Sequence, residues 1–420
     1  MEETALITNE AVVFGLLMAL LGLIFWAASE ARFKKFFSVI PALLLCYFLP
    51  SLLTNTGLVP RETGIYFIAS RYLLPASLVL LTLSIDLKAV FGLGPKALIM
   101  FFTATFSVII GGPLALLTVS WISPETVGGV GPEAVWRGLS TIAGSWIGGG
   151  ANQAALYEVF KPSEALYSAM ITVDVVVAEI WMAIILLGAS KSDRVDAWLK
   201  ADNSSVKELQ ANMEELLKQS AKIPTLADAM KILGLAFGAV ALSHAAGDFL
   251  APWFAQNAPY TANFSFTSDF FWIVIIATTL GLLLSFTPAR NLEGVGASRW
   301  GSVFIYILVG SIGMKMDLME AFSQPGLIAV GALWMTIHVL ILVLVARLIR
   351  APFFFLAVGS KANIGGAASA PVAAAAFHPS LAPVGVLLAV LGYALGTYGG
   401  WVSGLIMYAV SGDPSPLMLP

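Results

Sequence analysis

The fold can be inferred from one stretch, Gly144-Ser-Trp-Ile-Gly-Gly-Gly-Ala-Asn152, because it interrupts an apolar run of nearly membrane-spanning length. A second interruption, Gly359-Ser-Lys-Ala-Asn-Ile-Gly-Gly-Ala367, occupies the matching place in the other half of the chain. Irregular backbone at membrane depth is tolerated only where protein or a water-filled cavity satisfies its amides and carbonyls. The elements that contain these stretches, 134–160 and 351–378, are therefore predicted to be broken helices or re-entrant hairpins, buried or beside water.

The composition of the 420 residues places the chain in a membrane. Hydrophobic residues make up 58% and charged residues 11%, with a mean hydropathy of +0.87, whereas a soluble protein carries about 25% charged residues. The 22 basic and 25 acidic residues form no block of one sign, so no nucleic-acid partner is predicted. The single cysteine, Cys46, excludes an intramolecular disulfide and a cysteine-based metal site.

Ten apolar stretches are long enough to cross a hydrocarbon layer of about 30 Å as helices. They occupy residues 11–28, 36–53, 65–87, 96–121, 165–189, 226–250, 269–287, 298–318, 325–348 and 381–410. Because the chain begins with acidic residues, the first stretch is predicted to be a span and not a cleaved signal. The predicted fold class is an all-α polytopic membrane protein with about 10 transmembrane helices plus two glycine-rich elements.

An internal repeat organises these spans. Ser84-Ile-Asp86-Leu-Lys is echoed by Met314-Lys-Met-Asp317-Leu, and each half then presents a long span, a broken element and a final span. This order predicts two repeats, 1–189 and 225–420, joined by an amphipathic cytoplasmic linker helix over 190–224.

The basic residues favour hairpins over crossing helices. Hairpins place about 17 basic residues inside and about 5 outside, against about 15 and 7 for full crossings. Hairpins also make the two repeats inverted relative to one another, as in many secondary transporters. Discontinuous crossing helices remain the alternative.

The tips of the two broken elements are predicted to bind substrate. At such a tip one half-helix offers free N–H groups and the other free carbonyls, and glycine lets a ligand approach the backbone. The predicted residues are Ser145, Gly148, Gly149, Gly150 and Asn152 in the first tip and Ser360, Asn363, Gly365, Gly366 and Ser369 in the second. Close helix packing through small residues is the alternative.

Ionisable residues inside spans are the other candidates. Asp174 and Glu179 are predicted to couple an ion, with Asp174 preferred because it lies nearer the middle of its span. A protonated carboxylic acid bonded to a neighbouring helix is the alternative. His338 is predicted to bind substrate or relay a proton, unless it only bonds across helices. Lys361 either neutralises a substrate carboxylate or faces the cytoplasm, and Arg71 either pairs with a carboxylate or, as we prefer, snorkels to the headgroups.

Three segments resemble one known family. They are the first tip with Val173-Asp174-Val, then Ser360-Lys-Ala-Asn-Ile-Gly-Gly-Ala-Ala-Ser-Ala-Pro371, and Gly385-Val-Leu-Leu-Ala-Val-Leu-Gly-Tyr-Ala-Leu-Gly-Thr-Tyr398. Nearly the whole chain resembles the YjcL-like integral membrane proteins, the family of domain of unknown function 819. That family is grouped with sodium/bile acid symporters, sodium/glutamate symporters and cation/proton antiporters. The resemblance implies inverted repeats and discontinuous elements at mid-membrane, but no particular substrate.

Together these features favour a secondary active transporter of a small carboxylate-bearing metabolite, such as an amino acid, a short peptide or an organic acid. Its coupling ion would be Na⁺ or H⁺, and no other cofactor or metal is predicted. The sequence has no Walker loop or other enzyme signature, so no enzyme activity is expected. A channel or passive uniporter and a non-transporting scaffold are the alternatives. The predicted location is the bacterial cytoplasmic (inner) membrane or an equivalent organelle membrane, with the bilayer and a small molecule as partners and a homodimer left open.

Overall fold

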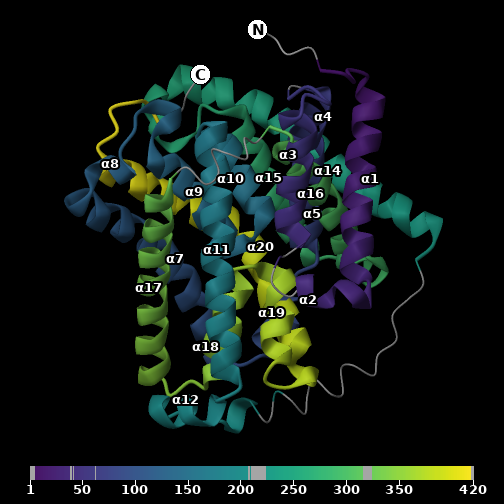
Figure 1. The fold of residues 1–420 in the computed structure, drawn as a ribbon. Coiled ribbons are helices and arrows are strands. Elements are labelled where there is room, and N and C mark those ends of the chain that lie inside the picture. Colours follow the sequence, from purple (N-terminus) through teal and green to yellow (C-terminus); the bar gives the residue numbers. More distant parts are fainter. Residues whose placement is uncertain are drawn as a thin grey trace.

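The computed structural model describes residues 5–37, 40, 42–61, 63–206, 209, 224–315 and 324–417. This part of the chain is built from helices and contains no strand (Figure 1). Seven of its helical segments are long and apolar enough to cross a membrane, or eight if one bent pair is counted as a span. They are α1 (Glu10–Ser29), Gly64–Leu83, α7 (Pro95–Ile122), α11 (Glu164–Ala189), α14 (Leu226–Asn257), α17 (Pro325–Leu348) and Pro379–Ser411, which contains α20 (Ala382–Ser411). The chain is therefore an all-α polytopic membrane protein.

Helices occupy all ten predicted spans, but three of them are short. α3 (Ala42–Asn55) has 14 residues, and α15 (Asp269–Ser285) and α16 (Ala297–Gly313) have 17 each. α15 also bends by 95° into the 3₁₀ helix η5 (Pro288–Val295). The number of crossings, ten, consequently stays a prediction.

Each glycine-rich element consists of two short helices. α9 (Val135–Gly148) and α10 (Gly150–Phe160) meet at Gly149, where φ is +79°. α18 (Phe353–Asn363) and α19 (Gly366–Ala375) meet around Gly365, where φ is +97°. Residues with a Cβ are strained at such angles, so the glycines allow the chain to reverse there.

Both helix pairs are hairpins, because the start of the first arm lies beside the end of the second. The rings of Trp136 and Phe160 are 5.5 Å apart, and Arg137 Nη1 donates a 2.7 Å hydrogen bond to the carbonyl of Phe160. In the second pair the rings of Phe354 and Phe377 are 5.4 Å apart. Each element thus enters and leaves the bundle at one end.

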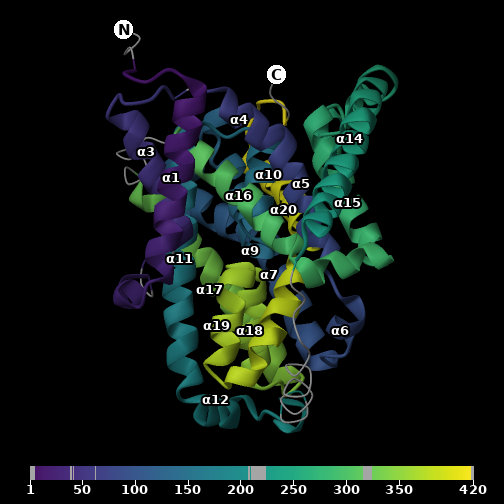
Figure 2. The same cartoon turned by 90° about the vertical axis from the view of Figure 1, so that its right-hand side faces the viewer.

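The hairpins enter from opposite ends of the molecule. Hairpin α9–α10 lies in the half where α20 ends, and hairpin α18–α19 lies in the half that carries α12 (Ser192–Leu199) (Figures 1 and 2). α1 begins, and α20 ends, at the end opposite α12 (Figure 2). An odd number of crossings therefore separates the start of α1 from α12, as a hairpin at 134–160 requires; one full crossing by that element would make the number even.

α20 runs between the two hairpins with a ridge of glycines against them. A Cβ at Gly392 would lie 2.6 Å from the carbonyl oxygen of Ile147 and 3.3 Å from that of Ala362. A Cβ at Gly396 would lie 2.7 Å from Gly148 Cα. Small residues at such contacts let membrane helices approach closely, and here they bring both tips to the middle of the bundle.

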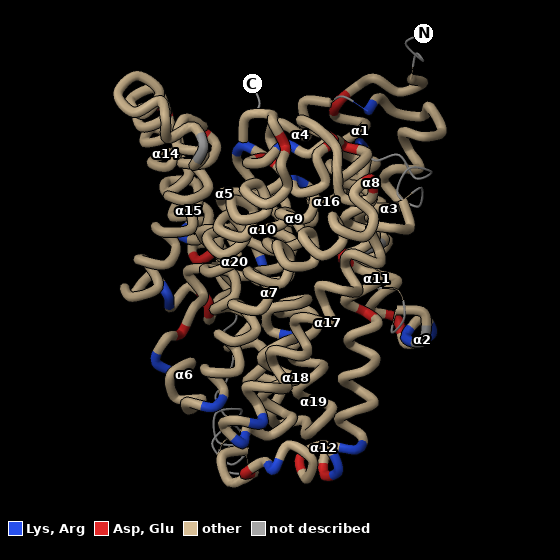
Figure 3. Tube along the Cα trace, turned by 90° about the vertical axis from the view of Figure 1, so that its left-hand side faces the viewer, with Lys and Arg blue, Asp and Glu red and all other residues tan. Residues whose placement is uncertain are grey.

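Charged residues gather at the end of the molecule that carries α12 and α6 (Leu87–Phe91), and the middle of the bundle has few (Figure 3). At that end Lys96 Nζ donates a 3.0 Å hydrogen bond to Asp202 Oδ2. This bond lowers the pKa of Asp202 to about 2. Residues 207–208 and 210–223 of the predicted linker, and the repeat landmark Asp317, lie outside the described residues.

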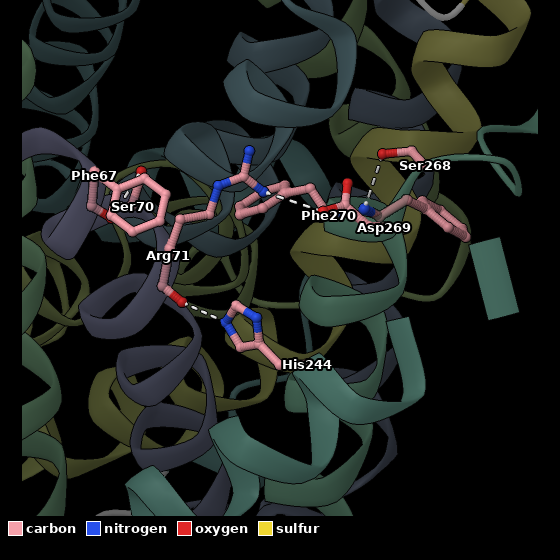
Figure 4. A network of polar contacts seen from close by, with 8 residues as sticks. Phe67, Ser70, Arg71, His244, Ser268, Asp269 and Phe270 are labelled. Carbon is pink, nitrogen blue, oxygen red and sulfur yellow. Dashed lines mark hydrogen bonds and ion pairs between the residues drawn. The ribbon is translucent and has the colours of Figure 1, made fainter. Parts of the chain in front are cut away.

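A π-helical turn, η2 (Ala69–Leu73), joins α4 (Gly64–Ile68) to α5 (Leu74–Leu83). His244 Nε2 donates a 2.8 Å hydrogen bond to the carbonyl of Arg71 in this turn (Figure 4). The guanidinium of Arg71 lies 4.5 Å above the ring of Phe270 and 3.9 Å from Asp269 Oδ2. Arg71 therefore pairs with a carboxylate, contrary to our preference for snorkelling, and ties α5 to α14 and α15.

Candidate functional site

The tips of the two hairpins line one cavity of about 100 Å³. Its other walls come from α5, α16 and α20, which pack around the tips. The lining residues are Gly149, Gly150 and Ala151 from the first tip, Gly365, Gly366, Ala367 and Ala368 from the second, and Leu81, Ser302, Ile305, Tyr306 and Tyr393. Segments far apart in the sequence thus share one small space in the middle of the bundle.

Two helix N-termini meet at this cavity. Gly150 is the first residue of α10 and Gly366 is the first residue of α19. The first N–H groups of a helix have no partner within it, and its N-terminus carries a partial positive charge. Ser302, Tyr306 and Tyr393 add hydroxyl groups to the lining. The cavity is consequently suited to a small anion with hydrogen-bonding groups.

Four predicted glycines line the cavity, but a fifth does not. Gly149, Gly150, Gly365 and Gly366 face it. Gly148 packs against α20, where a Cβ would lie 2.7 Å from the carbonyl oxygen of Gly392. Gly148 therefore serves close helix packing, the alternative to ligand binding, whereas the other four glycines border the cavity.

Asp174 on α11 binds both arms of the first hairpin. Its Oδ2 accepts hydrogen bonds from Ser145 Oγ at 2.5 Å and Gln153 Nε2 at 3.1 Å. Its Oδ1 accepts a 2.7 Å bond from Trp146 Nε1. Three donors favour a carboxylate that is buried in this way, and Ser145 is occupied by Asp174 instead of facing the cavity.

The two predicted asparagines fasten the hairpins to neighbouring helices. Asn152 Oδ1 accepts a 2.5 Å bond from Thr397 Oγ1 on α20, and its amide donates to the carbonyl of Gly148 at 2.8 Å. Asn363 Oδ1 accepts a 2.8 Å bond from Thr105 Oγ1 on α7. Both asparagines are fully buried, so they position the tips and do not line the cavity.

His338 and Ser360 belong to a hydrogen-bonded chain between helices. His338 Nδ1 lies 2.7 Å from Ser107 Oγ, and its Nε2 lies 2.8 Å from Ser360 Oγ. Ser360 Oγ also accepts a 2.8 Å bond from Trp181 Nε1. This chain joins α7, α17, α18 and α11, which matches the interhelical alternative for His338.

Lys361 is fully buried beneath the second tip. Its Nζ donates a 3.4 Å hydrogen bond to the carbonyl of Ala178 and lies within electrostatic range of Glu179 and Asp174. A Cβ at Gly365 would lie 3.2 Å from this nitrogen. The structure therefore places Lys361 beside the cavity-lining tip and not at the cytoplasmic face.

The remaining predicted residues lie beside these groups. Glu179 is half-buried on α11. Ser369 Oγ is 3.5 Å from the carbonyl oxygen of Ile364, at the second tip. Within the described residues no group of three His, Cys, Asp or Glu side chains is placed to hold a metal ion.

A family model described as "Protein of unknown function (DUF819)" matches residues 15–410. The chain belongs to this family. It is also similar to the "Uncharacterized membrane protein YjcL" of Bacillus subtilis (strain 168), with 24% identity over 403 residues that cover 91% of this chain and 95% of that protein. The resemblance noted in the sequence is thereby confirmed.

Several groups at this candidate site were not predicted from the sequence. Trp146 and Gln153 lie inside or next to the quoted glycine-rich motif, and Tyr393 lies inside the third family-like segment. Ser302 and Tyr306 lie on α16, a mostly apolar helix with no motif that sets these two residues apart. Only the packing of α16 against the tips shows that they reach the cavity.

Proposed function

We propose that the protein is a secondary active transporter of a small carboxylate-bearing metabolite, coupled to Na⁺ or H⁺. The observation that carries this proposal is the single cavity between two hairpin tips that enter from opposite ends of the bundle. A site at mid-membrane, built from discontinuous helices of two halves, is the arrangement that secondary transporters use.

The chemistry of the cavity supports a carboxylate as the group that is recognised. The N-termini of α10 and α19 attract negative charge, and the buried ammonium of Lys361 lies directly behind the second tip. Hydroxyls of Ser302, Tyr306 and Tyr393 are available for the rest of the molecule. A cavity of about 100 Å³ is small for a ligand pocket, so among the candidates it favours a small amino acid or organic acid over a peptide.

Asp174 supports ion coupling because its charge determines how the first tip is held. As a carboxylate it accepts bonds from Ser145 and Trp146 on α9 and from Gln153 on α10. Protonation, or a cation beside the carboxylate, would weaken these bonds and release the arms that position Gly149 and Gly150. Ion binding and substrate binding would then share one hairpin, which gives the two a coupling free energy.

The orientation in the membrane follows from the charges. Lys and Arg residues gather at the end that carries α12 (Figure 3), so this end would face the cytoplasm by the positive-inside rule. The chain would then lie in the cytoplasmic membrane of a bacterium or an equivalent organelle membrane, with the first hairpin entering from the outer face.

Reconstituted protein in proteoliposomes provides the test. A thermal-shift screen of amino acids, short peptides and organic acids, each with and without Na⁺, selects ligands that stabilise the fold. Uptake of the selected radiolabelled compound is then followed under an imposed Na⁺ or pH gradient. Accumulation above the outside concentration supports the proposal. Equilibration without accumulation would favour a channel or uniporter, and neither ligand stabilisation nor uptake would favour a scaffold.

A further inference from the structure

Four tyrosines come from the first hairpin and from helices near it, and of these elements α3, α4 and α10 lie in the half of the molecule opposite α12 (Figures 1 and 2). They are Tyr47 on α3, Tyr66 on α4, Tyr157 on α10 and Tyr167 on α11. Tyr47 and Tyr167 are each 1% exposed. Neither the cavity nor the hydrogen bonds of Asp174 uses these side chains, so their clustering needs a separate explanation.

One stripe of α11 leads from the end of the molecule to Asp174. Glu164, Tyr167 and Asp174 occupy positions i, i+3 and i+10, which lie on one face of a helix. At 1.5 Å per residue, Asp174 lies about 15 Å deeper than Glu164. The Glu164 side chain is 46% exposed, whereas Asp174 is 9% exposed. The stripe therefore runs from solvent to the buried carboxylate.

The outer end of the tyrosine row is held by carboxylates. The Tyr66 hydroxyl donates a hydrogen bond to Glu158 Oε1 on α10. Lys315 Nζ lies 3.2 Å from Glu164 Oε1 and 4.1 Å from the centre of the Tyr66 ring. Glu158 and Glu164 thus meet Tyr66 at the entrance of the row.

The inner end of the row contains two unsatisfied hydroxyls. The rings of Tyr157 and Tyr167 are 4.3 Å apart, and the hydroxyl of Tyr167 lies next to that of Tyr47. Within the described residues neither Tyr47 Oη nor Tyr167 Oη has a hydrogen-bond partner. Tyr47 is also within electrostatic range of Asp174. Buried hydroxyls are normally bonded to protein or to ordered water, and a water molecule between these two would satisfy both.

We propose that Tyr66, Tyr157, Tyr167 and Tyr47, with water between the last two, form a proton route from the outer carboxylates to Asp174. Each hydroxyl donates its own proton toward Asp174 and receives one from the neighbour nearer the surface. The net result is one proton added to Asp174 and one taken from the outer solution, with every tyrosine unchanged. This inference rests on the proposed function and specifies H⁺ as the coupling ion.

The groups that face the row from the other helices fit this role. α3 adds Cys46 and α16 adds Tyr306, both of which lie within electrostatic range of the row. Lys315, just after α16, faces Glu164, and Glu158 faces Tyr66. Among the described residues Lys315 is the cation at the outer end of the row, and Lys361 lies within electrostatic range of Asp174 at its inner end.

The test measures how fast Asp174 gains a proton. Full-length protein is inserted into proteoliposomes in one orientation, verified by protease access to the α12 end. A rapid drop in pH is applied on one side, and the carbonyl stretch of the protonated Asp174 is followed by infrared spectroscopy. Asp174→Asn identifies the band. No substrate is needed, so the result is independent of whether an uptake assay succeeds.

Tyr167→Phe and Tyr47→Phe remove only a hydroxyl from the row. When the pH drops at the end opposite α12, each variant is expected to slow protonation of Asp174 about tenfold, which is the effect of losing one hydrogen-bonded step. The rate for a drop at the α12 end and the midpoint of the titration are expected to stay unchanged. Tyr398→Phe, which removes the hydroxyl bonded to Thr279 outside the row, is the matched control and is expected to leave both rates unchanged.

Two results would overturn the proton route. Equal rates in wild type, Tyr167→Phe and Tyr47→Phe would show that protons reach Asp174 by another path. A band that never titrates would remove the acceptor from the route. Both results leave Na⁺-coupled transport intact. Tenfold slower protonation of Asp174 in the variants, without any gradient-driven uptake by the wild type, would instead contradict the transporter and not the proton route.

Discussion

Trp146 Nε1 donates a 2.7 Å hydrogen bond to Asp174 Oδ1, which joins the tip of the first hairpin to the middle of α11. Ser145 and Gln153 bind the other oxygen of the same carboxylate. The residue that titrates and the backbone that borders the cavity are therefore only a few bonds apart. A change of charge at Asp174 therefore alters the hydrogen bonds that position Gly149 and Gly150.

Asp174→Asn should abolish gradient-driven uptake. The amide keeps the shape of the carboxylate, but it does not titrate at physiological pH. Its NH₂ group also faces one or two of the donors that bind the carboxylate in the wild type. That mismatch should lower the free energy of unfolding by about 1–3 kcal/mol. Uptake in proteoliposomes and thermal unfolding in detergent measure the two effects.

Trp146→Phe is the matched control for this variant. It removes one donor to the carboxylate and leaves a cavity beside Trp334, so it should destabilise the fold by about 2–4 kcal/mol. The charge of Asp174 stays in place, so ion-dependent uptake should be retained. Ion-dependent uptake that persists in Asp174→Asn would remove this residue from the coupling site.

Gly149→Val and Gly366→Val should abolish transport. Both glycines have positive φ, +79° and +57°, which a β-branched residue adopts only at a cost of about 1–3 kcal/mol. The added side chain would also enter the cavity. Gly150→Ala, at a position with open space around the new Cβ, should fold like the wild type. Normal uptake by both valine variants would show that the tips are packing motifs and that substrate binds elsewhere.

Removal of residues 413–420 should destabilise the protein more than Arg137→Met does. Arg137 is fully buried and donates 2.7 Å bonds to the carbonyls of Phe160, Pro416 and Leu417. Without the tail, a buried cation loses two acceptors, which should cost about 3–5 kcal/mol. Arg137→Met removes the charge itself and should cost less.

The two changes at Arg137 should also be coupled. Arg137→Met introduced into the truncated chain should raise its melting temperature, because it removes the charge that truncation left unpaired. A double-mutant cycle of melting temperatures measures this coupling. Simple addition of the two losses would show that the tail stabilises the fold by contacts other than those to Arg137.

Cysteines introduced at Lys35 and at Ser204 should be protected together from an impermeant thiol reagent in intact cells, in a chain with Cys46 replaced. α2 (Lys34–Phe37) lies at the lower end of α1, on the side of α12 (Figure 2). A cysteine at Tyr260, which is 74% exposed in the loop between α14 and α15, should be labelled. Labelling at only one of Lys35 and Ser204 would contradict the hairpins.

The sequence by itself was sufficient to locate the two breaks and the intramembrane aspartate. Glycine clusters at 148–150 and 365–366 end helices by a local backbone effect, which neighbouring residues do not override. A carboxylate in an apolar span can be recognised in the sequence for a similar reason. The free-energy cost of burying it in hydrocarbon depends little on which helix lies next to it. Composition likewise determined the fold class.

What each polar group binds depends on how the helices pack in three dimensions. Asn152 and Asn363 look like ligand-binding groups in the sequence, yet their partners are Thr397 and Thr105, 245 and 258 residues away along the chain. A polar side chain in a membrane must be satisfied, and a distant helix satisfies it as well as a ligand does. Tyr306 reaches the cavity for the converse reason: the local pattern of α16 is that of any apolar helix, and its position against the two tips is set by packing alone.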